Sequence, residues 1–420
     1  GGAGSAPGSG AGSDVSHLTG TDPETTGLRI LLAHADPGAP PLSEPLANVI
    51  AGGIGIGVFA FHYEQEGFSS FFLAGRHSWD DARAYLAGAA ERLGWVLGTA
   101  EASAAATADR RLRGALERGP VIAWVDAASL GTRGLPIEMA GGGYHTLVVH
   151  RIDDAAGSAT VSDLTQRPFE LPLDVLSAAR ARIAKQKNRV AWLELPDVAS
   201  TGGTDPSSAV RAGLAVTVQG LRSPRTRNFS FDALADWSDR LRGRGATSWV
   251  KVFPPGEWRW SGLASIHEYV EHYGSGGGLG RRRFAAGLRE AAAVSGNDSF
   301  LALADRYDVL AAAWSDLARA ALPDEVPLLR RTREVQDRRA AAYAAGIIAA
   351  DGSPDPAVVT AWRELDSLRA EARTRYPMSE EDAAGHLAGL ADRVSAIHAR
   401  ESGALDALSA LVDSGAAARA

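Results

Sequence analysis

The feature that most constrains the fold is a near-continuous apolar segment at residues 120–126, Pro-Val-Ile-Ala-Trp-Val-Asp. A strand with one face in water alternates apolar and polar residues, whereas a strand covered on both faces is apolar throughout. The segment therefore predicts a central strand of a sheet. Residues 141–154 and 159–164, separated by a short turn, predict an antiparallel hairpin that follows it.

Periodicity also divides the chain into parts with different secondary structure. Strands and helices are mixed before residue 197, whereas only helices are predicted after residue 208, so we expect an α/β (α+β) fold class. The predicted parts are a disordered tail (1–13), an α/β domain (14–197), a Ser/Thr/Gly-rich linker (198–208), a helical domain (209–324) and C-terminal helices (325–420). Three antiparallel helices in the last part are a candidate surface for a homodimer.

Composition argues against several classes of function. The 420-residue chain has no cysteine, which excludes disulfides, thiolate metal sites and a cysteine nucleophile. Its net charge of −7 does not favour binding to nucleic acid. No apolar run approaches the ~20 residues of a membrane span. Residues 1–13 lack the basic and apolar regions of a signal peptide, so we expect a cytoplasmic protein.

The segment at residues 21–32 predicts a helix that begins inside the α/β domain. Pro23 suits the first helical position, and the Asp22 carboxylate can accept the free N–H groups of the first turn. A helix N-terminus is a common place for a nucleophile or a bound anion. The alternative is a capped helix without a chemical role. Residues 51–57 alternate glycine and apolar residues but no helix follows directly, so we expect packing against this first helix rather than dinucleotide binding.

The clearest candidate site combines His145 and Asp163, which lie on the two strands of the predicted hairpin. A carboxylate beside an imidazole can orient the ring and stabilise its protonated form, as in many nucleophilic sites. The glycines before His145 leave space for a substrate, and we expect Gly143 and Tyr144 to contact it. The alternative is a histidine that only supports the structure.

No metal ion and no cofactor are predicted. A metal site built from His17, Asp22, His145 and Asp163 is conceivable, because these side chains are suitable ligands. However, no local spacing such as H-E-x-x-H supports such a site.

A second candidate feature is the glycine-rich segment 274–280, which is followed by Arg281, Arg282 and Arg283. Cations at a helix start oppose the helix dipole, so helix formation does not explain them. Free backbone N–H groups and guanidinium groups suit a phosphate or an acidic partner, and we expect Arg281 and Arg282 to bind substrate. The alternative is a flexible loop with solvated arginines.

Taken in order, several segments resemble the butirosin biosynthesis protein H-type acyltransferases and the helical domain of unknown function that often follows them. The resemblance covers roughly residues 16–345. The matching patterns are Gly20-x-x-Pro23-x-Thr25-Thr26-x-Leu28-Arg29, Leu42-Ser43-Glu44, Gly53-x-Gly55-x-Gly57-x-Phe59, Gly142-Gly143-x-His145-x-x-x-Val149, Val161-x-Asp163, Gly274-x-Gly276-Gly277-Gly278-Leu279 and Ala321-Leu322-Pro323-Asp324.

The resemblance implies a papain-like α/β domain followed by a helical domain. Members of the namesake type transfer an aminoacyl group from a carrier-protein thioester to an amine of an aminoglycoside. Their nucleophile is the cysteine of a His-Cys pair at the start of the first helix. In this chain Asp22-Pro23 replaces that pair, whereas His145 and Asp163 are retained.

Three interpretations follow for the function. The chain is an acyltransferase or cyclase that acts on a carrier-bound acyl intermediate without a covalent step, with His145, Asp163 and Asp22 as its catalytic groups. Alternatively, it catalyses cyclisation, elimination or hydrolysis of a released small molecule. The third interpretation is a non-catalytic homologue that binds a carrier protein or a small molecule. Thr21 and Thr25 are expected at the substrate, and their hydroxyls are candidate replacements for the missing nucleophile.

Overall fold

The computed structural model of the chain describes residues 16–63, 68–194, 205–346, 348 and 352–417. The predicted tail at 1–13 lies outside the described residues, as does most of the predicted linker at 198–208. The last residues assigned to that linker, 206–208, form the first turn of a helix.

A six-stranded antiparallel sheet forms one part of the molecule, with the strand order β3-β8-β4-β5-β6-β7. Its strands are β3 (Val96–Ala100), β4 (Val121–Asp126), β5 (Tyr144–Asp153), β6 (Ser158–Ser162), β7 (Phe169–Pro172) and β8 (Val190–Glu194). The central position of β4 and the β5–β6 hairpin are confirmed. Strands β3 and β7, which are short, were not predicted.

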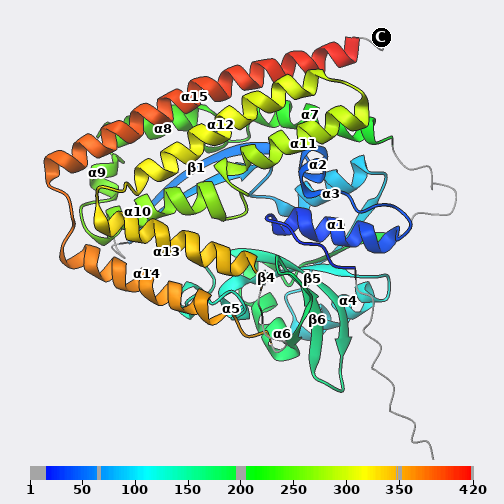
Figure 1. Ribbon diagram of the computed structural model, residues 1–420. Coiled ribbons are helices and arrows are strands. Elements are labelled where there is room, and N and C mark those ends of the chain that lie inside the picture. Colours follow the sequence, from blue (N-terminus) through cyan, green and yellow to red (C-terminus); the bar gives the residue numbers. More distant parts are fainter. Residues whose placement is uncertain (1–15, 64–67, 195–204, 347, 349–351, 418–420) are drawn as a thin grey trace, which may run out of the picture.

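Helices cover both faces of this sheet, which explains why β4 is apolar along its length. Val121, Ala123 and Val125 pack with α4 (Ala105–Leu116) and α6 (Leu173–Ala181) in one core. Ile122 and Trp124 pack in another core, with α1 (Pro23–Ala35) and α3 (Ala82–Arg92). Figure 1 shows α1 on one side of β4 and β5, with α4 and α6 on the other. The alternation of a strand thus sends successive side chains into two separate cores.

The start of α1 is fixed by the predicted cap. The Asp22 carboxylate accepts a hydrogen bond from the backbone N–H of Thr25, and Pro23 occupies the first helical position. Both features satisfy or remove donors that the first turn leaves unpaired. The helix packs on β5, so its N-terminus lies at the sheet that carries His145.

A second, two-stranded sheet belongs to the helical core. Strands β1 (Ile54–Tyr63) and β2 (Phe68–Arg76) pair with each other only, and their buried residues pack among the C-terminal helices. The expectation that the glycine run packs against α1 is wrong. A Cβ at Gly53 would instead lie within 3.0 Å of Thr217 or Phe284, which belong to helices of the second half.

The remaining helices complete the fold: the short helix at Ala127–Leu130 packs on β4 and α6, and the others contribute to the core that contains this hairpin. They are α2 (Glu44–Ile50), α5 (Ala127–Leu130), α7 (Pro206–Arg222), α8 (Asp232–Leu241), α9 (Trp249–Val252), α10 (Glu257–His267), α11 (Arg281–Ser295), α12 (Ser299–Ala321), α13 (Pro327–Ala344), α14 (Pro356–Thr374) and α15 (Glu380–Ala417). None of the described helices is long and apolar enough to cross a membrane. A sheet-containing first part and a mostly helical second part confirm the α+β class.

The last three helices do not form the expected antiparallel bundle. Helix α13 packs on α14, whereas α15 runs along α7, α8 and α12, at the top of Figure 1. Much of the apolar side of α15 is therefore covered within the chain, including Leu387, Leu390 and Leu408. The homodimer stays a prediction.

A buried ion pair fastens α15 to the two-stranded sheet. The fully buried Arg281 donates from Nε to Glu401 Oε1 at 2.7 Å. Its other nitrogens donate to the carbonyl oxygens of Gly55, Gly75 and Leu279. One guanidinium therefore connects β1, β2, α11 and α15.

This arrangement predicts a large difference between two adjacent arginines. Arg281→Met should lower the free energy of unfolding by about 3–5 kcal/mol, because Glu401 would remain as an unpaired buried charge. The control is Arg282→Met, on the exposed side of the same helix turn, which should change it by less than about 0.5 kcal/mol. Urea denaturation of both variants measures this difference, and equal effects would refute the structural role of Arg281.

Candidate functional site

The predicted contact between His145 and Asp163 is present. His145 lies on β5, only 3% exposed, and its Nε2 is 2.7 Å from Asp163 Oδ1. Asp163 follows the last residue of β6, so the β5–β6 hairpin places the two side chains next to each other.

Arg133 fixes which nitrogen of the imidazole carries the proton. Its guanidinium donates to His145 Nδ1 at 3.2 Å. A guanidinium can only donate, so Nδ1 is unprotonated and accepts this hydrogen bond, and the Nε2 proton is directed to Asp163. This assignment follows from the hydrogen-bond partners. His145 thus has the tautomer of a general base, with the accepting nitrogen at Nδ1.

Asp163 is held as a fixed negative charge. Besides His145, its carboxylate accepts from the backbone N–H of Leu164 at 2.7 Å and from the Tyr343 hydroxyl at 3.1 Å. Burial alone would raise the pKa of Asp163, but His145, Arg133 and the N–H of Leu164 hold it well below its usual value. Arg133 also lies over the Tyr343 ring, 4.4 Å from its centroid.

A second cluster surrounds Asp22 at the start of α1. Its Oδ1 accepts from both the N–H and the hydroxyl of Thr25, and its Oδ2 is 3.1 Å from Arg76 Nε. Burial alone would raise the pKa of Asp22, but the guanidinium groups of Arg76 and Arg283 and the Thr25 hydrogen bonds hold it below its usual value. Asp22 is therefore ionised at neutral pH.

Glu24 contacts the same guanidinium as Asp22, but its pKa is shifted in the opposite direction. Its Oε2 lies 3.3 Å from an Nη atom of Arg76. Burial raises the pKa of Glu24 to about 7, with a further contribution from the charge of Asp22 and with Arg76 acting against it. Two neighbouring carboxyls with pKa values shifted in opposite directions are typical of an acid/base site.

Thr25 is part of this network and is almost completely buried. Its hydroxyl proton goes to the Asp22 carboxylate, which can only accept, so the Tyr85 hydroxyl donates to Thr25 Oγ1 at 2.8 Å. Burial raises the pKa of Tyr85 to about 12, so it keeps its proton. A substrate cannot reach this threonine without opening the network, which argues against Thr25 as a nucleophile.

Tyr144 lies beside the second cluster. It precedes His145 on β5, and its hydroxyl donates to the carbonyl oxygen of Trp79 at 3.2 Å. Burial, and then the negative charge of Glu24, raise the pKa of Tyr144. Among the described residues no hydrogen bond or ion pair joins Asp22 directly to His145. The two clusters therefore have separate polar partners.

The other predicted contact residues differ in how accessible they are. Gly143 is exposed, and a Cβ added there would meet no atom within 4 Å, which agrees with free space before His145. Thr21 is exposed, and its hydroxyl contacts the carboxylate of Glu44 and Arg283. Both remain candidates for substrate contact.

The expected role of Arg281 in substrate binding is wrong, because its side chain is fully buried against Glu401. Arg283 is also buried, and it donates to the Thr21 hydroxyl and to the Gly274 carbonyl oxygen. Only Arg282 of the three is exposed. Buried Arg281 and Arg283 therefore donate hydrogen bonds to carbonyl oxygens of the glycine-rich segment, and they are not available to bind an anion.

The conceivable metal site at His17, Asp22, His145 and Asp163 is not assembled. His17 contacts the Ser162 hydroxyl through Nδ1 and the Thr165 carbonyl oxygen through Nε2, each at 2.9 Å. Both of its ring nitrogens are therefore occupied by non-metal partners.

Several residues of the site were missed in the sequence: Glu24, Arg76, Tyr85, Arg133 and Tyr343. Glu24 lies in the segment already singled out, but an acid in a first helical turn is explained by the helix dipole alone. The other residues reach the site only through tertiary packing, so no local pattern marks them.

Comparison with known protein families identifies two domains. The family described as butirosin biosynthesis protein H, N-terminal, matches residues 22–164. A domain of unknown function, DUF4872, matches residues 175–347. The search of curated proteins found no match to the chain. The two matches follow one another in the order that the resemblance predicted.

The pKa of Glu24 predicts a specific pH dependence of stability. Folded Glu24 keeps its proton to about pH 7, whereas an unfolded glutamic acid loses it near 4.5, so stability falls as pH rises through this window. Glu24→Gln removes this contribution. The difference in unfolding free energy, wild type minus Glu24→Gln, should fall by about 2 kcal/mol between about pH 5 and about pH 8.

Urea denaturation across this range measures the difference. Glu138→Gln, on an exposed turn, is the surface control. Parallel curves for wild type and Glu24→Gln would show that Glu24 ionises normally.

Proposed function

Because residues 22–164 belong to the butirosin biosynthesis protein H, N-terminal family, and a DUF4872 domain follows, we propose a biosynthetic acyl-transfer enzyme. It acts on an acyl thioester, delivered by a carrier protein, by proton transfer and without a covalent acyl-enzyme. The acceptor is an amine of a second small molecule or, in a cyclisation, of the acyl chain itself.

The observation that carries the proposal is the buried His145–Asp163 pair, whose unprotonated Nδ1 accepts a hydrogen bond from Arg133. A thioester is already activated, so an amine attacks its carbonyl carbon directly once it is positioned and a base is present. His145 Nδ1 takes the proton from the nitrogen as the C–N bond forms. Asp163 stabilises the imidazolium that results.

The second cluster supplies the remaining groups. The C–S bond breaks with its electron pair on sulfur, and Glu24, with a pKa of about 7, gives the leaving thiolate a proton. Asp22 stays ionised and favours an ammonium group nearby. Arg133 must leave Nδ1 before His145 can act, and its guanidinium is then available to the developing oxyanion.

Two observations support a mechanism without a covalent intermediate. The chain has no cysteine, and Pro23 stands in the second position of the family's His-Cys pair. The nearest buried hydroxyl, that of Thr25, is engaged by Asp22 and Tyr85. Proton transfer by Glu24 and His145 does not require a carrier protein. The same two groups could therefore serve cyclisation, elimination or hydrolysis of a released molecule.

A specific contact favours a second candidate function. Arg133 occupies the lone pair that a general base needs, and Asp22 and Glu24 are already paired with Arg76. A site whose polar groups satisfy each other can bind a carrier protein or a small molecule without catalysis. The two candidates differ in whether turnover depends on His145.

Replacing His145 tests the catalytic proposal. His145→Gln should lower turnover at least about 100-fold while circular dichroism stays unchanged, because general-base catalysis contributes about that much. The assay uses aminoacyl N-acetylcysteamine thioesters with an aminoglycoside acceptor, followed by mass spectrometry of the products. Wild-type turnover in the variant would exclude catalysis by His145, and binding without turnover in both proteins would favour the second candidate.

The absence of a covalent step is tested separately. After incubation with the same thioesters and a rapid acid quench, the intact mass of the protein should not increase. An added acyl group that disappears in Thr21→Val or Thr25→Val would instead identify a hydroxyl nucleophile and contradict the mechanism.

A further inference from the structure

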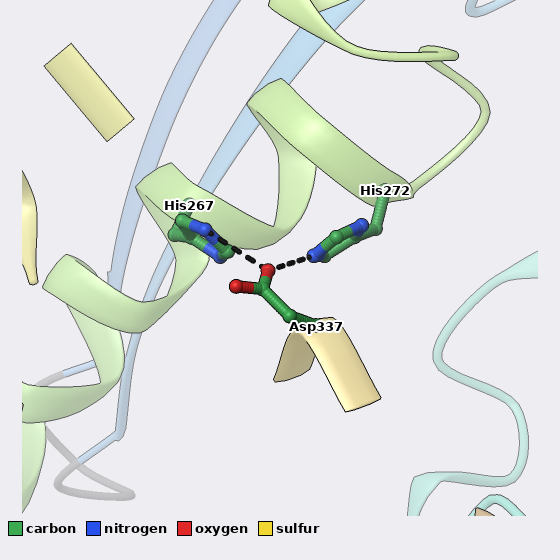
Figure 2. Close-up of side chains that lie close together, drawn as sticks. All are labelled: His267, His272 and Asp337. Atoms are coloured by element: carbon green, nitrogen blue, oxygen red, sulfur yellow. Dashed lines mark hydrogen bonds and ion pairs between the residues drawn. The ribbon is translucent and has the colours of Figure 1, made fainter. Parts of the chain in front are cut away.

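Three potential metal ligands converge away from the candidate acyl-transfer site. His267, at the end of α10, and His272, in the turn that follows, both point toward Asp337 on α13 (Figure 2). Asp337 Oδ1 lies 2.9 Å from His272 Nε2 and 3.4 Å from His267 Nε2. One ligand atom from each residue lies within 4.8 Å of both others.

A π-helical turn, Glu268–His272, brings the two histidines to one side. Residues five apart do not share a face in an α-helix, where positions three or four apart do. In a π-helix the hydrogen-bond repeat is one residue longer, so His267 and His272 lie on the same side of the turn, with their rings edge to face. Single π-turns are rare and are frequent at functional sites.

Gln336 orients the imidazole of His267. Its amide nitrogen donates to the Ala264 carbonyl oxygen at 3.1 Å, which leaves the amide oxygen facing His267 Nδ1, also at 3.1 Å. Nδ1 therefore carries the proton, and in the neutral ring Nε2 presents a lone pair to the Asp337 carboxylate. Two electron-pair donors at this distance repel each other unless a proton or a metal ion lies between them.

Two acidic residues of the π-turn lie near the cluster. Glu268 is paired with Arg339, but Glu271, in the same π-turn, has a buried Oε1 with no hydrogen-bond partner within the described part of the chain. Asp337 and Glu271 together give two negative charges, which a divalent cation would offset.

We propose that His267 Nε2, His272 Nε2 and Asp337 Oδ1 form a binding site for a divalent transition-metal ion of the zinc class. Two imidazoles and one carboxylate are a common ligand set for such ions. Ligand atoms about 2.1 Å from a tetrahedral ion lie about 3.4 Å apart, close to the two separations of 2.9 Å and 3.4 Å that join Asp337 to the histidines. Gln336 has the role of an outer partner that fixes the ligand tautomer.

The site leaves one position of the ion unfilled. Three protein ligands are one fewer than a closed structural zinc site has, and the Asp337 side chain is 51% exposed, so water has access. Helix α13 also carries Tyr343, which contacts Asp163, six residues or about 9 Å beyond Asp337. The ion would thus hold the π-turn against the helix that supports the His145 cluster. This inference does not depend on the proposed reaction.

Zinc titration of the chelator-treated full chain by calorimetry tests the site. We expect one ion per chain in the wild type and no competition from Mg²⁺, which prefers oxygen ligands. Asp337→Asn and His272→Ala should each weaken binding at least about tenfold, because each removes a ligand. His398→Ala, on α15 outside the cluster, is the matched control and should bind zinc as the wild type does.

Asp337→Asn keeps the test valid if the histidine variants fold poorly, since Asp337 is half exposed. Cobalt(II) provides a second measurement, because its visible absorption reports nitrogen ligands in the wild type and should be lost in Asp337→Asn. The inference is overturned if the wild type binds no zinc, if Asp337→Asn binds it equally well, or if Mg²⁺ competes. If the wild type binds no zinc, the two histidines and Asp337 form only ion pairs.

Discussion

The buried guanidinium of Arg76 is the interaction on which the rest of the site depends. It lies at the end of β2, a strand of the helical core, and contacts Asp22 and Glu24 of α1, a helix of the sheet core. Its aromatic neighbour, Tyr85, stacks 4.0 Å from it. One charge therefore joins the two cores at the start of α1. Removing it would deprive two buried carboxyls of the cation that contacts both.

This arrangement gives the start of α1 two carboxyls that differ in protonation. Asp22 serves both as the helix cap and as a permanent negative charge, while burial leaves Glu24 able to exchange a proton near neutral pH. The His145–Asp163 pair keeps the geometry of a base and its orienting carboxylate. Proton transfer is the chemistry that these four groups share, and nothing in it requires a covalent intermediate.

Features set by local sequence were predictable, and features set by distant packing were not. The Asp22 cap, the doubly covered β4 and the His145–Asp163 contact follow from residues that are close in sequence or paired on one hairpin. Arg281 was misassigned because a charged residue beside glycines is usually exposed, and its partner Glu401 lies 120 positions away. The pairing of His267 and His272 was not predicted because only a π-turn, which has no sequence signature, brings them together.

Nitrogen-15 NMR of the His145 imidazole at neutral pH tests most directly whether His145 can act as a general base. We expect a neutral ring with its proton on Nε2, hydrogen-bonded to Asp163, and an unprotonated Nδ1 that can accept a proton from substrate. Comparison with Asp163→Asn assigns the signal. A ring protonated on both nitrogens, or on Nδ1 alone, would contradict the account, because no lone pair would then be available for general-base catalysis.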